Sequence, residues 1–430
     1  MKTIKEIHDC YLSCVNVVID TRKVIKGSLF VALKGAKVDG NDFALQALDA
    51  GARFVLIDRD DCYVNNSTIL VQNSLQTLQE LATFHREFLN IPIIGLTGSN
   101  GKTTTKELFV RVLQKKYSTG ATIGNLNNHI GVPLTLLSFT SDTKIGIVEM
   151  GANHQKEIAF LSSIAKPDVG YITNFGKAHL EGFGGVEGVI KGKSELYDFI
   201  KLNKGQLLVN IDDPIQEEKT RGFDRFTFSF INVAADVYLK FQMVDNFVVI
   251  THDHTVISTN LFGSYNASNS AAAIALGMYY NIEINDIKEA IESYSPDNNR
   301  SQVLQHGEHR VILDAYNANP SSMEVAIQNF GLMEYSSKMM ILGDMFELGE
   351  ESPLEHHRIA ELALGLNDVT TYFVGEHFFK SSKEFELSKV NFFHDFDSLV
   401  EELRLHPIKK SLLLIKGSRG MALERVLNYL

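Results

Sequence analysis

The residues best suited to do chemistry stand in a short glycine-bearing turn near residue 100. An apolar run, residues 92–97, leads into Gly98-Ser99-Asn100-Gly101-Lys102-Thr103-Thr104, and a helical pattern follows. Glycines let backbone N–H groups converge on an anion, a helix N-terminus adds positive potential, and Lys102 adds a full charge. The turn therefore predicts a cradle for the phosphates of a nucleoside triphosphate. The Thr103 hydroxyl stands where such loops bind Mg²⁺.

The spacing departs from the usual phosphate-binding loop. That loop would place a glycine five positions before Gly101, where this chain has Leu96. A glycine turn before a helix can also be purely structural, because glycine is the default residue of tight turns. The strand before the turn and the Lys-Thr-Thr run after it favour the phosphate cradle.

Polar side chains follow the neighbouring apolar runs. Ligands of open α/β sheets bind at the carboxyl ends of strands, and Glu149 and His179 each come after an apolar run. A cation beside a triphosphate would offset the cost of burying Glu149, whereas a helix cap or a surface ion pair is the plain alternative. A lone histidine is usually structural, and His179 is favoured by its position alone. For Lys191 and Lys193 the residues do not separate a functional role from a solvated basic face.

Two further polar loops lie in the last third of the chain. Their candidate residues are Asp314, Tyr316, Asn317 and Asn319 in the first loop and Lys416, Ser418 and Arg419 in the second. Carboxylate, phenol and amide groups can hydrogen-bond a ribose or a small polar substrate, and paired cations suit a carboxylate or phosphate. Ordinary turn chemistry is the alternative for either loop.

The elements that must position these residues predict three α/β domains. Residues 1–90 combine short strands with helical segments at 41–50 and 74–89. Residues 91–297 alternate nearly continuous apolar strands with helices, which indicates a buried, mostly parallel sheet. A polar turn at 295–300 precedes a doubly wound, Rossmann-like domain over 298–430. The P-loop-like phosphate cradle lies in the central domain, and the polar loops of the last domain suggest a cleft that closes over the nucleotide.

Composition excludes several classes of protein. The net charge is −11, and no basic stripe with interleaved aromatic residues is present, so nucleic acid is not expected as a partner. Cys10, Cys14 and Cys62 form no metal or disulfide pattern and read as reduced thiols. No apolar run approaches the roughly 18 residues of a membrane helix. We expect a cytoplasmic protein that is not integral to a membrane.

The chain resembles the Mur ligases, ATP-dependent amide-forming enzymes of peptidoglycan precursor synthesis. The resemblance spans nearly the whole chain in the family's order. Its segments are GLTGSNGKTTTKE from Gly95, GNLNNHIGVPLTLL from Gly124, IVEMGANHQKEIA from Ile147, NFGKAHLEGFG from Asn174, KGKSELY from Lys191, GSYNASNSAAAIAL from Gly263, LDAYNANPSSM from Leu313, LGDMFELG from Leu342 and IKGSRGMALE from Ile415. The resemblance implies an N-terminal UDP-sugar domain, a central ATPase and a C-terminal Rossmann-like domain.

For ATP and metal, the resemblance implies roles residue by residue. The ATP-binding set is Gly98, Ser99, Asn100, Gly101, Lys102, Thr103 and Thr104 at the phosphates, Asn266 and Asn269 at the adenine, Arg300 at an interdomain phosphate contact and Asp314 at the ribose. Thr103 and Glu149 would hold one Mg²⁺, and His179 a second. Lys193 matches a lysine that many members carbamylate, which would make it an anionic ligand of the metal site. The implied catalytic residues are Lys102, Glu149, His179, Lys193 and Arg300.

The substrates are implied in the same way. Thr21, Arg22, Asn127 and Asn128 match positions near the UDP-sugar peptide, and the two C-terminal loops fall where an incoming dipeptide would bind. The loop Asp-Ala-Tyr-Asn-Ala-Asn-Pro and the absence of an Asp-Asn-Pro-Arg signature favour the branch that joins D-alanyl-D-alanine to UDP-N-acetylmuramoyl-tripeptide. In that chemistry the peptide carboxylate attacks the γ-phosphate of ATP, and the dipeptide amine then displaces phosphate from the acyl phosphate.

One departure and two alternatives accompany this reading. Many members have Pro-Gly-Arg at the second domain boundary, whereas this chain has Asn298-Asn299-Arg300, which keeps the arginine and leaves the turn open. A ligase for another amino acid or a folate-like acceptor would act on a single amino acid. A catalytically silent nucleotide-binding scaffold would bind ATP and release no phosphate. We expect a monomer.

Overall fold

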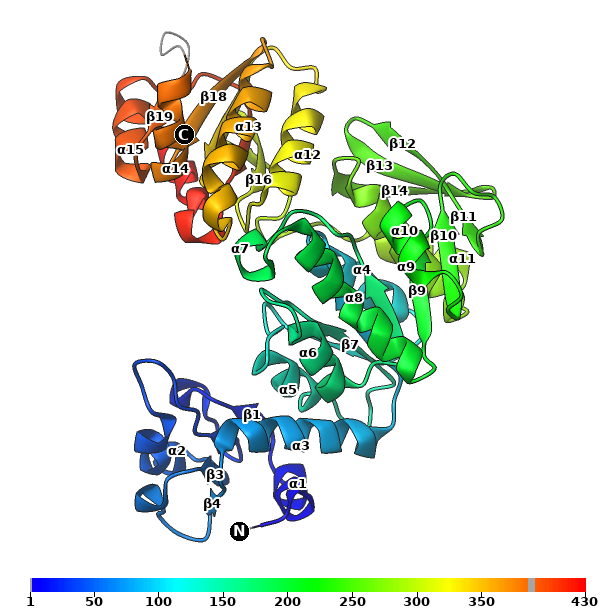
Figure 1. Ribbon diagram of the computed structural model, residues 1–430, viewed down its shortest axis with the longest axis vertical. Coiled ribbons are helices and arrows are strands. Elements are labelled where there is room, and N and C mark those ends of the chain that lie inside the picture. The colour runs from blue at the N-terminus through cyan, green and yellow to red at the C-terminus, as the bar shows by residue number, and fades with distance from the viewer. Residues whose placement is uncertain (1, 386–390) are drawn as a thin grey trace.

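The computed structural model describes residues 2–385 and 391–430 of the chain. Its three α/β units follow one another along the long axis, with the two chain ends in the outer units (Figure 1). The fold class expected from the sequence is confirmed, because the chain forms a three-domain α/β structure whose central and C-terminal sheets are largely parallel.

The N-terminal unit is a small parallel sheet with helices around it. Its strands run in the order β1-β2-β3-β4, with bounds β1 Val17–Val18, β2 Leu29–Val31, β3 Phe54–Ile57 and β4 Thr68–Leu70. The helices are α1 Ile4–Leu12, α2 Ala44–Asp49 and α3 Ser74–Leu89, with short 3₁₀ turns at η1 Thr21–Lys23, η2 Gly40–Phe43 and η3 Asp60–Cys62. The segment expected to be helical at 41–50 is thus a 3₁₀ turn followed by α2.

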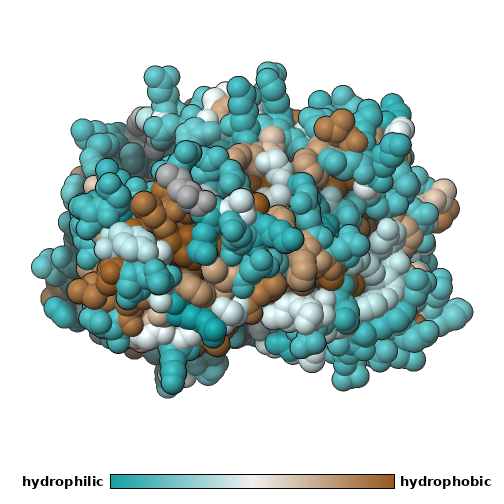
Figure 2. All heavy atoms as spheres, turned by 90° about the horizontal axis from the view of Figure 1, so that it is seen from below, coloured by the Kyte–Doolittle hydropathy of each residue, from teal (hydrophilic) through white to brown (hydrophobic). Residues whose placement is uncertain are grey.

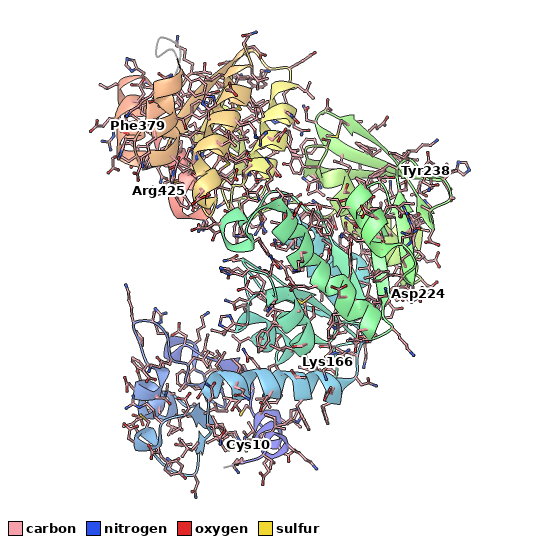
Figure 3. The ribbon with its side chains drawn as sticks, in the orientation of Figure 1. Cys10, Lys166, Asp224, Tyr238, Phe379 and Arg425 are labelled. Carbon is pink, nitrogen blue, oxygen red and sulfur yellow. The ribbon has the colours of Figure 1, made fainter. Side chains whose placement is uncertain are left out.

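Helix α3 joins the N-terminal unit to the central one. It begins after Asn73, whose side chain accepts a hydrogen bond from the Gln76 amide, and ends at Asn90 in a left-handed conformation (φ 48°). Near its end, Arg86 donates to Asp168 (2.8 Å), which directly precedes the interior strand of the central sheet that begins at Val169. Lys166 lies at this junction (Figure 3). Apolar side chains of α3 share one buried cluster with the central helices, so the two units pack through a continuous core.

The central unit is built on a seven-stranded, all-parallel sheet in the order β11-β10-β9-β8-β5-β7-β6. Its strands are β5 Ile93–Thr97, β6 Thr119–Ala121, β7 Ile145–Glu149, β8 Val169–Ile172, β9 Gln206–Asn210, β10 Arg225–Ser229 and β11 Val237–Tyr238. Its helices are α4 Lys102–Leu113, α5 Gly131–Leu136, α6 Glu157–Ala165, α7 Leu180–Phe183, α8 Val186–Leu202, α9 Pro214–Thr220, α10 Asn266–Tyr279 and α11 Ile284–Glu292. The strands are buried, as expected for a parallel sheet covered on both faces.

A small antiparallel sheet projects beside the central unit (Figure 1). It consists of β12 Lys240–Val244, β13 Phe247–His252 and β14 Thr255–Phe262, and the sequence analysis did not predict it. The edge strand β12 is exposed along its whole length, so it carries no clean alternation of buried and exposed residues.

The C-terminal unit is a six-stranded sheet in the order β15-β16-β20-β17-β18-β19, parallel except for the β15-β16 pair. Its strands are β15 Gln302–His306, β16 His309–Asp314, β17 Lys338–Gly343, β18 Val369–Val374, β19 Asn391–Phe393 and β20 Leu412–Lys416. Its helices are α12 Pro320–Gly331, α13 Ser352–Leu364, α14 Glu376–Ser381 and α15 Phe396–Leu405, with 3₁₀ turns at η4 Gly349–Glu351, η5 Ser382–Glu384, η7 Arg419–Met421 and η8 Leu423–Tyr429. The doubly wound arrangement expected for this region is confirmed.

The surface is mixed in polarity. Figure 2 shows the face at the N-terminal end, where hydrophilic side chains dominate and apolar ones gather in patches between them. Cys10, Cys14 and Cys62 are free thiols, and Cys10 lies on α1 at this end of the molecule (Figure 3). Among the helices of residues 2–385 and 391–430, none is both long and apolar enough to cross a membrane.

Candidate functional site

A cavity of about 760 Å³ opens between the central and C-terminal units. Its central wall comes from the turn after β5, the loop after β6, the segment after β7 and the start of α10. Its C-terminal wall comes from the segment after residue 299, the loop after β16 and the end of β20. The lining residues include Ser99, Asn100, Gly101, Lys102, Thr103, Thr104, Asn127, Asn128, Glu149, His179, Asn266, Asn269, Arg300, Asp314, Tyr316, Asn317, Asn319 and Lys416. Most residues singled out from the sequence therefore meet around one cavity.

The turn after β5 needs its two glycines. Gly98 and Gly101 have φ values of 145° and 80°, in the region that side chains disfavour. A Cβ on Gly98 would lie 1.8 Å from Thr173 Oγ1, and a Cβ on Gly101 would lie 2.5 Å from Asn269 Oδ1. Because Gly101 precedes α4 without any side-chain cap, the first N–H groups of the helix are left for a ligand.

Lys102 folds back over the turn. Its Nζ donates hydrogen bonds to the carbonyl oxygens of Gly98 (2.7 Å) and Ser99 (3.3 Å). Burial lowers the pKa of Lys102, while the charge of Glu149 acts in the opposite direction. The cation is thus held at the mouth of the anion cradle.

Thr103 and Glu149 meet at the carboxyl end of the central sheet. The Thr103 hydroxyl donates to Glu149 Oε2 (3.2 Å), Asn127 Nδ2 donates to Oε1 (3.0 Å), and the Glu149 amide donates to Thr122 Oγ1 (2.9 Å). Glu149 is only 2% exposed, and the Lys106 ammonium is 4.0 Å from its Oε2. One hydroxyl and one carboxylate in contact fit Mg²⁺, which completes its oxygen shell from water and substrate phosphates. In the described part of the chain, no three His, Cys, Asp or Glu side chains cluster as an all-protein metal site.

Two buried side-chain amides on α10, those of Asn266 and Asn269, pack next to the phosphate-binding turn and the start of α4. Asn269 Oδ1 accepts from the Thr105 hydroxyl (3.1 Å), and Asn269 Nδ2 donates to Asn266 Oδ1 (2.8 Å). Asn266 Nδ2 in turn donates to the carbonyl of Phe262 (2.7 Å). Both amides line the cavity, and their contacts fix how α4 sits against α10.

His179 lines the same cavity as Thr103 and Glu149, whereas Lys193 is not among the lining residues. His179 has a left-handed backbone (φ 55°), and its Nδ1 forms an ion pair with Glu347 of the C-terminal unit. This contact is the first cause of the lowered pKa of Glu347. Lys193 is 1% exposed, with Nζ 5.4 Å from the centre of the Phe183 ring. Burial, and then the charge of Lys102, hold the pKa of Lys193 well below its ordinary value.

The loop after β16 and the end of β20 form a tight polar cluster. Asp314 Oδ2 accepts from Lys416 Nζ (2.6 Å), and Oδ1 accepts from the Ser301 amide (3.0 Å). Lys416 also donates to the carbonyl of Asn317 (3.2 Å). The Asn317 Oδ1 accepts from the amide of the next residue, so this side chain stabilises its own loop (2.9 Å).

The segment before β15 places Arg300. Asn299 and Ser301 both have positive φ, 57° and 51°, which is how the chain turns without the Pro-Gly pair usual in the family's pattern. Arg300 Cζ lies 3.6 Å from the centre of the Tyr316 ring, and its Nε is buried without a hydrogen-bond partner among the described residues. The guanidinium is therefore stacked and still has an unused donor.

The remaining C-terminal candidates are placed differently. Asn319 caps α12 and donates to Asn100 Oδ1 (2.7 Å). Ser418 Oγ accepts from the Phe346 amide (2.9 Å) and Arg419 donates to Glu424 (2.8 Å), and neither residue lines the cavity. Arg419 Cζ is 6.0 Å from the Tyr316 ring.

The residues expected near a UDP-sugar peptide fall into two groups. Asn127 and Asn128 line the cavity, and Asn128 Oδ1 accepts from the Gly131 amide (2.9 Å) at the start of α5. Thr21 and Arg22 lie in the turn η1 of the N-terminal unit, away from the cavity. The side chain of Arg22 is 87% exposed and pairs with Asp20, and its hydrogen bonds lower the pKa of Asp20 to about 2.

Several residues that shape the site were not singled out from the sequence. Glu107 on α4 accepts hydrogen bonds from Tyr294 (2.5 Å) and Asn298 (3.1 Å), and so ties the connection between units to the phosphate-binding helix. Lys177 forms an ion pair with Glu355 of the C-terminal unit (2.5 Å). Both partners come from distant parts of the chain, and no local spacing signals such pairs.

Known families match the chain in three consecutive segments. The models described as "Mur ligase family, catalytic domain", "Mur ligase middle domain" and "Mur ligase, glutamate ligase domain" match residues 14–86, 96–277 and 299–419.

Curated relatives match over nearly their whole length. The UDP-N-acetylmuramoyl-tripeptide--D-alanyl-D-alanine ligase of Bacillus subtilis is 34% identical over 95% of this chain and 92% of its own. The ligase of the same name from Escherichia coli is 33% identical over 96% and 93%. Among solved structures, MurF from Acinetobacter baumannii superposes with a TM-score of 0.86 at 28% identity, covering 99% of this chain and 98% of its own. MurF ligase from Thermotoga maritima in complex with ADP gives a TM-score of 0.83 at 28% identity, covering 100% and 98%.

Proposed function

This chain belongs to the Mur ligase family, and we propose that it joins D-alanyl-D-alanine to UDP-N-acetylmuramoyl-tripeptide with ATP as the energy source. The observation that carries the proposal is the shared cavity, where the phosphate cradle of the central unit faces the polar loops of the C-terminal unit. An enzyme that first phosphorylates one substrate and then binds a second one needs a phosphate-binding wall and a wall of polar loops on the same cavity.

The chemistry explains why cations surround the cavity. A carboxylate does not react with an amine directly, since oxide would have to leave, so it must first be activated, and we propose an acyl phosphate as the activated form. Phosphorylation brings two anions together, and Lys102 and Arg300 would neutralise that charge while holding the groups in line. The unused Nε donor of Arg300 and the placement of Lys102 over the turn support these roles.

Mg²⁺ belongs to the proposal through the residues that would hold it. Thr103 and Glu149 would ligate one ion, and when bound it supplies charge neutralisation at the phosphates. We propose His179, together with a carbamylated Lys193, for a second ion. The lowered pKa of Lys193 supports this, because a neutral amine is the form that can take up carbon dioxide.

The remaining proposals assign residues to the adenine, the ribose, the UDP-sugar peptide and the dipeptide. Asn266 and Asn269 would lie at the adenine, and Asp314 at the ribose, where its contact with Lys416 orients it. Thr21 and Arg22 would bind the UDP moiety, with Asn127 and Asn128 nearer the peptide. Tyr316, Asn317, Lys416, Ser418 and Arg419 would surround the dipeptide, directly or by shaping their loops. We also propose the domain limits 1–90, 91–297 and 298–430, a cytoplasmic location and a monomeric state.

Phosphate release tests the proposed function. Purified protein with ATP, Mg²⁺ and UDP-N-acetylmuramoyl-tripeptide should release phosphate only when D-alanyl-D-alanine is added. A Lys102→Ala variant with an unchanged melting temperature is the matched control and should be inactive. Turnover with a single amino acid in place of the dipeptide would favour a different ligase. Nucleotide binding without turnover would favour a silent scaffold.

A further inference from the structure

Asn100 is the residue of the phosphate cradle that reaches out of the central unit. Its backbone is fixed within that unit, because its N–H donates to Asn174 Oδ1 (3.1 Å) and its carbonyl accepts from the Thr173 hydroxyl (2.5 Å) and from Asn174 Nδ2 (3.0 Å). Its side chain is used differently. Asn100 Oδ1 accepts a hydrogen bond from Asn319 Nδ2 (2.7 Å), across 219 residues of sequence.

Asn319 holds this bond from a rigid position. It is the N-cap of α12, where its Oδ1 accepts from the Ser322 amide (2.9 Å) and its N–H donates to Ser322 Oγ (3.0 Å). The residue is 7% exposed, and its two bonds commit the amide oxygen to Ser322 and one amide N–H to Asn100. These bonds leave one amide N–H of Asn319 as the donor for a further partner in the cavity, such as a dipeptide.

Close packing surrounds the same contact. The Lys177 amide donates to Ser321 Oγ (2.8 Å), so the first turn of α12 is seated on the loop after β8. A Cβ on Gly176 would lie 2.9 Å from Asn100 Nδ2 and 3.2 Å from Ser321, which shows how little space separates the two units. The Asn319 to Asn100 bond can form only while the C-terminal unit is docked at this distance.

We propose that Asn319 is a positioning residue that couples docking of the C-terminal domain to the shape of the phosphate cradle. Asn100 directly precedes Gly101 and Lys102 and lines the cavity, so the bond from Asn319 orients an amide side chain beside the phosphate-binding turn. Linkage requires the coupling to act in both directions: nucleotide in the cradle favours docking, and docking tightens nucleotide binding. The inference rests on the proposed ligase function. It adds Asn319 as a residue that acts on the nucleotide site through Asn100.

A double-mutant cycle tests the coupling. Asn319→Ser keeps a good N-cap but is too short to reach Asn100, and Asn100→Ser removes the acceptor while leaving the backbone bonds in place. We expect each single variant to weaken ADP binding and to lower kcat/KM for ATP by about three- to tenfold, the range of one hydrogen bond. The double variant should be no worse than either single variant, because both remove the same contact.

Other outcomes would overturn the inference. Additive losses in the double variant would mean that the two side chains act separately. A rise confined to the KM for D-alanyl-D-alanine in Asn319→Ser, with ADP binding unchanged, would assign Asn319 to the dipeptide instead. Asn319→Ala, which loses the cap as well, separates the two roles, since it should lower the melting temperature more than Asn319→Ser does. An inactive wild type would contradict the proposed function instead, and the ADP cycle can be measured without turnover.

Discussion

The guanidinium of Arg300 lies over the ring of Tyr316, with 3.6 Å between Arg300 Cζ and the ring centre. Arg300 comes from the connection between the central and C-terminal domains, and Tyr316 from the loop after β16. The Tyr316 amide also donates to the carbonyl of Asn299 (3.1 Å), so ring and connection are held together by two contacts. These contacts therefore hold the Arg300 side chain in place in the absence of substrate.

The first prediction concerns this stacked pair. Replacing Tyr316 with alanine should lower kcat/KM for ATP by about fivefold, since a cation–π contact contributes about 1 kcal/mol. Tyr316→Phe keeps the ring face and should stay within about twofold of wild type. Steady-state kinetics with ATP varied would measure both. Equal losses in the two variants would show that the phenol hydroxyl, and not the stacking, matters.

The second prediction concerns the charge of Glu149. Glu149→Gln keeps the volume and can still bond Asn127, but it removes the negative charge next to Thr103. We expect kcat to fall by about a hundredfold or more, as for other losses of preorganised charge in an active site, and the Mg²⁺ requirement to rise. Glu308→Gln, at an exposed turn, is the matched control. A normal Mg²⁺ dependence in Glu149→Gln would remove the metal role.

The third prediction concerns the glycines of the cradle. Gly98→Ala places a Cβ against Thr173 and strains a backbone with φ 145°, so ADP binding should be lost and the melting temperature lowered. Gly35→Ala serves as control, because its nearest neighbour would be an ordinary 3.4 Å away. Calorimetric titration with ADP and thermal melts would compare them. Tight ADP binding by Gly98→Ala would mean that the turn does not hold phosphate.

Much of the cradle could be predicted from the sequence because its signal is local. Gly98, Gly101, Lys102 and Thr103 stand within six residues after an apolar run, and the turn requires glycine at the first two of these positions. Glu149 was identifiable because strand ends of a parallel sheet meet at one edge. The doubly wound C-terminal domain was likewise visible in its buried apolar strands.

The contacts between domains could not be predicted in this way. His179 meets Glu347, and Asn319 meets Asn100, only because the C-terminal domain docks where it does. Neither side chain carries a signal of its partner in its own segment. The metal role of His179 and the substrate role of Asn319 stay predictions. The antiparallel sheet was missed for another reason: it forms an addition beside the parallel sheet, and its edge strand β12 is exposed along its whole length and so contributes no buried face.

The fourth prediction concerns pH and the junction of the first two domains. His8 and His85 are buried with His8 Nε2 3.0 Å from His85 Nδ1, and His85 Nε2 lies 2.9 Å from the Phe139 carbonyl. Burial lowers the pKa of both histidines in the folded protein. The unfolded chain therefore binds more protons below the ordinary histidine pKa of about 6.5, so stability is retained above that pH and lost as the pH falls below it.

Thermal melts between about pH 7.5 and 5 would measure this loss, with the ordinary histidine pKa inside the range. His85→Leu should be less stable than wild type at the upper end and should show a shallower decline on acidification. His254→Gln, at an exposed turn, is the control variant and should keep the wild-type slope. An unchanged slope in His85→Leu would place the proton uptake elsewhere.

The last prediction concerns Glu107, which anchors the connection that carries Arg300. Glu107 accepts from the Tyr294 hydroxyl (2.5 Å) and from Asn298 Nδ2 (3.1 Å). Burial, and next the charge of Glu107, raise the pKa of Tyr294, so the phenol remains a donor throughout the neutral range. Glu107→Ala should lower kcat/KM by about tenfold through a loosened Arg300, because it removes two charge-assisted hydrogen bonds. Tyr294→Phe loses only one of the two and should show a smaller loss. If Glu107→Ala caused no further loss of kcat/KM in an Arg300→Ala background, the effect would pass through the arginine. Additive losses of kcat/KM would show instead that Glu107 acts on α4 itself.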